Sequence, residues 1–188
     1  MRAALAAVPF AALVLSCGNV PKLHFNVTRD IGPETISGSI TPCSLTSHLP
    51  VDLLGNPFNV TITQQQDFPQ QNTDVQHITS AKLDELTLSL TATSPQQNWD
   101  FLEDITISAE ANGLPKATVA SIGIDTESAV AIAAGSSTLS LKPTGLNLAP
   151  YIKASGGFSL TSDAVGCPPS QDADFTGHVR LAIVAKPL

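Results

Sequence analysis

The stretch Leu86-Thr87-Leu88-Ser89-Leu90-Thr91-Ala92 places an apolar residue at every second position, with Thr or Ser between them. A period of two is typical of a β-strand that is buried on one face. Ile105-Thr106-Ile107-Ser108-Ala109 repeats the pattern, and Ser94-Pro95-Gln96-Gln97-Asn98 between the two segments is composed of turn-forming residues. The sequence therefore predicts an antiparallel pair at the centre of the chain. Leu88 and Ile107 should face the core, and the threonine before each should face away.

Short alternating segments recur on both sides of this pair, bounded by Gly, Pro, Asn and Asp. Residues 145–153 are expected to form one helical turn, and no longer amphipathic helix is predicted after the N-terminal segment. About nine short strands of this kind predict an all-β fold, an antiparallel β-sandwich of the immunoglobulin-like or jelly-roll type. The segments expected outside the central pair are residues 23–28, 35–40, 58–63, 117–124, 128–134, 138–142, 158–162 and 177–185.

The composition indicates one domain and limits its partners. Of 188 residues, 43% are hydrophobic and 13% charged, which is enough apolar material for a packed core. The formal charge is −7, and no run of Lys and Arg is present, so nucleic acid is not an expected partner. A negatively charged body is also not attracted to anionic lipid headgroups, so membrane association would need a covalent or apolar cause.

Residues 1–16 have the features of a secretory signal peptide. A single positive charge at Arg2 precedes the apolar run Ala3 to Leu15, and small residues follow. A helix of thirteen residues rises only about 20 Å, whereas a hydrocarbon core is about 30 Å thick. The run is therefore expected to direct export rather than to remain as a transmembrane helix.

The end of this run, Val14-Leu15-Ser16-Cys17, resembles the lipobox of bacterial lipoproteins, although Leu15 stands where that family usually has a small residue. The resemblance implies cleavage before Cys17 and modification of Cys17 with lipid, including an acyl chain such as palmitate. Gly18 after the cysteine, rather than Asp, favours the outer membrane of a Gram-negative cell, with the body in the periplasm or at the surface. The alternatives are an ordinary cleaved signal and an uncleaved chain in which Cys17 is buried.

Residues 17–22 would then form the lipidated N-terminus and a short tether, and residues 23–188 would form a single β-sandwich domain. With Cys17 used for lipid, Cys43 and Cys167 remain as an even pair in loops marked by proline. Export to an oxidising compartment favours a disulfide between them. Two unrelated thiols are the alternative.

Chemistry-bearing motifs are scarce in this sequence. The four histidines are scattered without the spacing of metal ligands, and no nucleophile or phosphate-binding motif is present. An acidic group surrounds the single Trp, and pairing of the central strands would bring its members to one end of the hairpin. The candidate ligand-binding residues are Trp99, Asp100, Glu103, Asp104, Asp84 and Glu85.

This group has several interpretations. Carboxylates in a loop suit Ca²⁺, paired carboxylates could hydrolyse a glycoside, and a solvated acidic edge needs no ligand. Trp99 could form a stacking platform for a sugar or pack in the core. Apart from this possible calcium ion, we expect neither a metal nor a cofactor.

The sequence is therefore expected to specify a non-catalytic lipoprotein that acts as an interaction or structural module of the cell envelope. Its partners would be the membrane, through the lipid, and an envelope protein or a glycan. The first alternative is a glycan- or lipid-binding domain, and the second is a secreted hydrolase.

Overall fold

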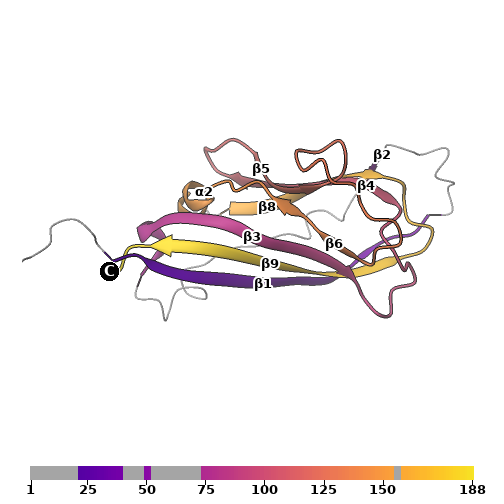
Figure 1. Ribbon diagram of the computed structural model, residues 1–188, viewed down its shortest axis with the longest axis horizontal. Coiled ribbons are helices and arrows are strands. Elements are labelled where there is room, and N and C mark those ends of the chain that lie inside the picture. Colours follow the sequence, from indigo (N-terminus) through magenta and orange to yellow (C-terminus); the bar gives the residue numbers. More distant parts are fainter. Residues whose placement is uncertain (1–20, 40–48, 52–72, 155–157) are drawn as a thin grey trace, which may run out of the picture.

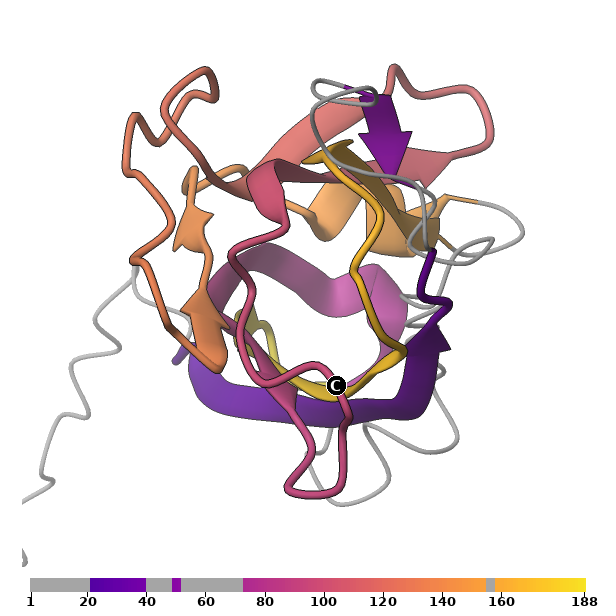
Figure 2. The same ribbon diagram turned by 90° about the vertical axis from the view of Figure 1, so that its right-hand side faces the viewer.

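The computed structural model describes residues 21–39, 49–51, 73–154 and 158–188. They form two antiparallel sheets that pack face to face, one of four strands and one of five (Figure 1). Seen along the long axis, the sheets are two separate layers (Figure 2). The predicted all-β sandwich is thus confirmed.

The four-stranded sheet contains the longest strands and has the order β1-β9-β3-β6. Along β9, buried side chains alternate with half-buried or exposed ones, as expected for a strand with one face on the core. The strand bounds are Leu23–Ile36 for β1, Ala173–Ala185 for β9, Ile78–Leu90 for β3 and Thr138–Ser140 for β6.

The five-stranded sheet has the order β2-β8-β4-β5-β7. Within the described residues, two short helices lie outside the sheets, η2 at Val75–His77 and α2 at Ala149–Lys153, and the second confirms the helical turn that the sequence predicts. In the described part of the chain, no helix is long and apolar enough to cross a membrane. The strand bounds are Leu49–Val51 for β2, Phe158–Gly166 for β8, Leu102–Ala111 for β4, Ala117–Ile122 for β5 and Lys142–Pro143 for β7.

The core lies between the two sheets and is built from the apolar positions of the alternating segments. Leu88 on β3 is 1% exposed and Ile107 on β4 is fully buried, whereas Thr87 and Thr106 are only half-buried. The predicted faces of both strands are therefore confirmed. Phe175 on β9 is also among the fully buried side chains, so the last long strand contributes to the same core.

The predicted pairing of the two central segments is wrong, because β3 and β4 belong to different sheets. β3 pairs with β9 and β6, and β4 pairs with β8 and β5. Residues 91–101 pass from one layer to the other instead of forming a hairpin turn. The backbone N–H groups of Thr91 and Gln96 in this connection donate to Asp174 and Asp172, near the start of β9. Alternation identifies which face of a strand is buried, but not which strand lies beside it.

Two further local predictions are wrong. The separate segments expected at residues 23–28 and 35–40 are joined, because β1 continues to Ile36 through a register shift between Ile31 and Glu34 that Gly32, with a φ of +85°, permits. The strand expected at residues 128–134 is a loop that makes one isolated bridge, between Gly123 and Val130. The strand expected at residues 58–63 lies outside the described residues.

Candidate functional site

Trp99 is a core residue and not a surface platform. Its side chain is fully buried, and its indole N–H donates to the backbone oxygen of Ser137 at 3.0 Å. The ring lies 5.6 Å from that of Phe101 and 5.7 Å, edge-on, from that of Phe175. A buried indole with its polar atom satisfied cannot stack on a sugar, so of the two interpretations of Trp99 the structure supports packing in the core.

The acidic residues expected to converge near Trp99 are divided between the two sheets. Arg180 on β9 binds two of them on the outer face of the four-stranded sheet, with its Nε 2.8 Å from Asp84 and its Nη1 3.1 Å from Glu85. Asp100 instead accepts the backbone N–H of Gly135 at 2.6 Å.

The remaining two candidates lie on β4. Asp104 accepts the backbone N–H of Asp125 at 3.3 Å, and Glu103 is exposed. Among the described residues, no three His, Cys, Asp or Glu side chains are grouped so that they could hold a metal ion. The prediction that these acidic side chains converge is wrong, because it assumed that β3 and β4 are neighbours in one sheet.

Of the two cysteines predicted to form a disulfide, the structure describes only Cys167. Cys167, just after β8, is 5% exposed, and its N–H donates to the backbone oxygen of Phe101 at 2.7 Å. Cys17 and Cys43 lie outside the described residues, so lipidation of the first and pairing of the second remain predictions.

A shallow groove of about 290 Å³ on the outer face of the four-stranded sheet was not foreseen from the sequence. Asp30 on β1 and His178 on β9 meet there, with His178 Nδ1 2.8 Å from Asp30 Oδ1. The hydroxyl-bearing Thr87, Ser89 and Thr176 line the same groove. The Asp30 side chain is 88% exposed, so water screens the pair, and the arrangement suits a polar ligand better than proton transfer.

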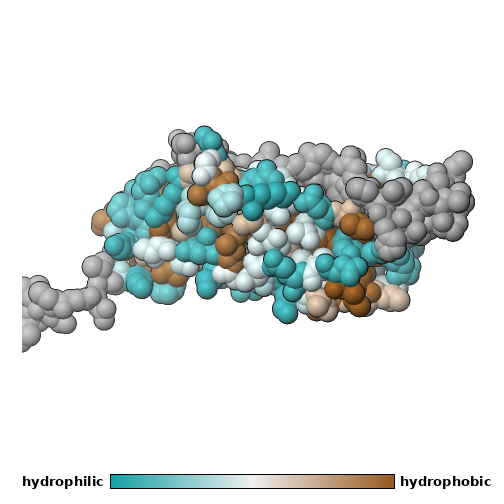
Figure 3. All heavy atoms as spheres, turned by 90° about the horizontal axis from the view of Figure 1, so that it is seen from above, coloured by the Kyte–Doolittle hydropathy of each residue, from teal (hydrophilic) through white to brown (hydrophobic). Residues whose placement is uncertain are grey.

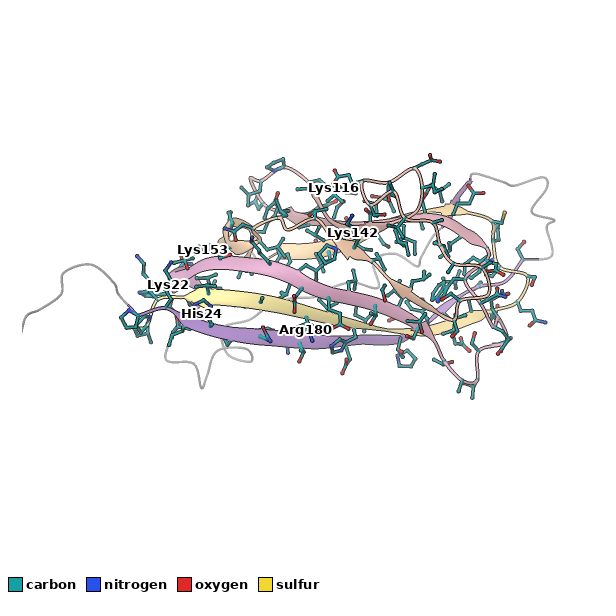
Figure 4. All side chains as sticks on the ribbon, viewed as in Figure 1. Lys22, His24, Lys116, Lys142, Lys153 and Arg180 are labelled. Carbon is teal, nitrogen blue, oxygen red and sulfur yellow. The ribbon has the colours of Figure 1, made fainter. Side chains whose placement is uncertain are left out.

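A second unforeseen feature is a cationic end of the sandwich, where β1 and β3 begin and β9 ends. Leu23 on β1 and Ile78 on β3 both pair with Ala185 on β9, so the residues beside them in sequence lie close together. We call this the basic end, and Figure 4 shows Lys22, His24 and Lys153 there. It consists of Lys22, His24, His77, Lys153 and Lys186.

One carboxylate at the basic end, Asp74, is already bound to a cationic side chain, and so are Glu110 and Asp163 on the five-stranded sheet. Asp74 lies 2.6 Å from His77 Nδ1, and this hydrogen bond lowers the pKa of Asp74 below its usual value. Glu110 lies 3.4 Å from the ammonium of Lys116, which also binds Asp163 at 2.9 Å. The hydrogen bond to Asp163 raises the pKa of Lys116, so this lysine stays charged at neutral pH.

The opposite end of the sandwich carries acidic residues. It contains the start of β4, the start of β9 and the loop after β5. The formal charge of −7 is therefore distributed unevenly along the long axis. The acidic residues at this far end are Glu34, Asp100, Glu103, Asp104, Asp125, Glu127, Asp172 and Asp174.

The face in Figure 3 is mainly hydrophilic, and its apolar residues occur in small separate groups. No protein-family model matches the chain, and neither a curated protein nor a solved structure matches it. The class of this protein therefore rests on its structure alone: the described residues form a two-layer antiparallel β-sandwich with an uneven charge distribution.

Proposed function

We propose that this chain is an exported lipoprotein, anchored through Cys17, whose sandwich serves as a non-catalytic interaction or structural module of the cell envelope. The observation that carries the proposal is the position of the first strand. β1 begins at Leu23, at the basic end, and five residues separate it from Cys17. Five residues span at most about 17 Å, so an acylated Cys17 would hold the basic end beside the membrane.

A second candidate function is the binding of a small polar ligand such as a glycan. The groove with the Asp30 and His178 pair favours it, because three hydroxyl groups and a carboxylate supply hydrogen-bonding partners for a polyol. A glycan array with the wild-type chain and with His178→Ala would test this function. Binding that is lost in the variant would support it.

The anchor leads to a direct prediction about acylation. Cells grown with a radiolabelled fatty acid should label the wild-type chain, and Cys17→Ala should abolish the label and remove the lipid-dependent membrane retention. Cys43→Ala is the matched control and should keep the label, because its thiol is not part of the lipobox-like segment. A wild-type chain that takes up no label would refute the anchor.

We also propose that Cys43 and Cys167 are joined. In support, Cys167 is buried where β8 ends, and the chain has only Cys17 and Cys43 as further cysteines. Of these two, Cys17 is assigned to lipid, which leaves Cys43. An oxidising compartment would preserve such a bridge.

The bridge predicts a specific product of tryptic digestion without reduction. Cleavage after Arg29, Lys82, Lys153 and Arg180 yields the peptides 30–82 and 154–180, each with one cysteine. Mass spectrometry should find them linked, and reduction should separate them. Two thiols that can be alkylated without reduction would contradict the pairing, and a link from residues 154–180 to Cys17 would contradict both cysteine assignments.

A further inference from the structure

We propose that the basic end is a contact surface for the phosphate groups of anionic phospholipids. This inference rests on the proposed anchor at Cys17 and extends it, because it names the lipid chemistry that the anchored domain meets. The surface is formed mainly by the ammonium groups of Lys22, Lys153 and Lys186. The anion it would recognise is the phosphodiester of a lipid headgroup.

The three lysines come from distant parts of the sequence and are brought together by the fold. Lys22 immediately precedes β1, and Lys186 immediately follows β9, its pairing partner. The backbone N–H of Lys186 donates to the oxygen of His77 at 3.0 Å, which ties the end of β9 to η2. Lys153 ends α2, which packs against η2 and β3. No local cluster of basic residues in the sequence marks this surface.

The three ammonium groups are available to an external anion. In the part of the chain that the structure describes, no carboxylate lies within ion-pair distance of Lys22, Lys153 or Lys186. Lys22 and Lys186 are exposed, and Lys153 is half-buried. Arg180 and Lys116, by contrast, are bound to carboxylates elsewhere on the sandwich.

The charge distribution also favours one orientation at an anionic surface. The Debye length in about 0.1 M salt is roughly 10 Å, so only groups held near the bilayer interact strongly with it. A short tether would keep the basic end within this range. The acidic far end would be repelled, so the long axis of the sandwich should point away from the membrane.

Chemical modification of lysines in the full-length acylated chain tests the contact. The chain is reconstituted in vesicles of phosphatidylcholine alone or with about 30% phosphatidylglycerol, and acetylation by an amine-reactive ester is followed by mass spectrometry. On anionic vesicles, Lys22, Lys153 and Lys186 should react several-fold more slowly, and salt should reverse the effect. Lys142, on β7, is the internal control and should react equally on both. Equal rates for the three lysines on both vesicles would overturn the proposal.

Two variants that remove the same charge provide a second test. Lys22→Gln/Lys186→Gln removes two cations from the basic end, and Lys116→Gln/Lys142→Gln removes two from the five-stranded sheet and its margin (Figure 4). Each lysine near an anionic surface contributes about fivefold to binding. The first variant should weaken salt-sensitive attachment to anionic vesicles by roughly twenty-five-fold, and the second by less than about threefold. Equal losses would show that only net charge matters. Circular dichroism confirms that both variants fold.

The proposal of a lipid anchor at Cys17 and the proposal of a phospholipid contact surface can be refuted separately. A wild-type chain with no acyl group on Cys17 would refute the anchor, whatever the lysines do. An acylated, vesicle-bound chain without selective lysine protection would refute the contact surface alone. If the chain proves to be unacylated, the same vesicles at low salt still decide the second question, because selective protection of the three lysines must appear there as well.

Discussion

Trp99→Ala is expected to lower the free energy of unfolding by about 3–5 kcal/mol, as is typical of large aromatic side chains removed from a core. Trp99 lies on the connection that carries the chain from one sheet to the other. It is fully buried and contacts the rings of Phe101 and Phe175, which belong to different segments of the core. Its removal would leave a cavity between the layers and would remove the hydrogen bond from the indole to the carbonyl of Ser137, which still accepts the backbone N–H of Leu90. Denaturant unfolding followed by circular dichroism measures the loss.

Trp99→Phe is the matched control for this effect. It keeps an aromatic ring in the core but loses the hydrogen bond to Ser137, which should cost about 0.5–1.5 kcal/mol because the Ser137 carbonyl still accepts the N–H of Leu90. The loss should therefore be clearly smaller than that of Trp99→Ala. A Trp99→Ala chain as stable as the wild type would show that the indole is not part of the core, and would restore the possibility of a surface platform.

Leu88→Ala should destabilise the sandwich by about 2–5 kcal/mol, because Leu88 is 1% exposed at the centre of β3. The range depends on how far the surrounding side chains relax into the space. Ile107→Ala on β4 should have a cost in the same range, since Ile107 is fully buried in the opposite layer. Both can be measured by thermal or denaturant unfolding.

Thr87→Ala is the control for the assignment of faces. Thr87 lies beside Leu88 but lines the outer groove and is half-buried, so its replacement should change the free energy of unfolding by about 0.5 kcal/mol or less. Equal costs at Leu88 and Thr87 would mean that β3 does not present its leucines to the core as the structure places them.

Several features were predictable from the sequence because they depend on local periodicity. A strand with a period of two buries one face wherever it lies, so the inward faces of β3, β4 and β9 follow directly from their residues. The helical turn at α2 and the overall two-layer architecture were predictable in the same way. The N-terminal features also come from the sequence, since residues 1–20 lie outside the described part of the structure.

The neighbours of each strand could not be predicted in this way. The nearest strands in sequence, β3 and β4, lie in opposite layers, and the partner of β1 is β9, near the other end of the chain. Pairing depends on the free energy of the whole assembled sheet, whereas alternation reports only burial on one side. The expected acidic site was wrong for this reason, because its residues were placed by an assumed hairpin.

The sequence alone thus determined the class of fold and the buried faces of β3, β4 and β9, and it predicts an export signal, because all of these follow from short segments and their composition. Only the tertiary structure decided where the charges lie. The sequence shows a net charge of −7 and no local run of basic residues, but the pairing of β1 and β3 with β9 gathers Lys22 and Lys186 at one end, and α2 adds Lys153. Composition counts charges without positions, and their positions depend on contacts between residues more than a hundred apart in the chain.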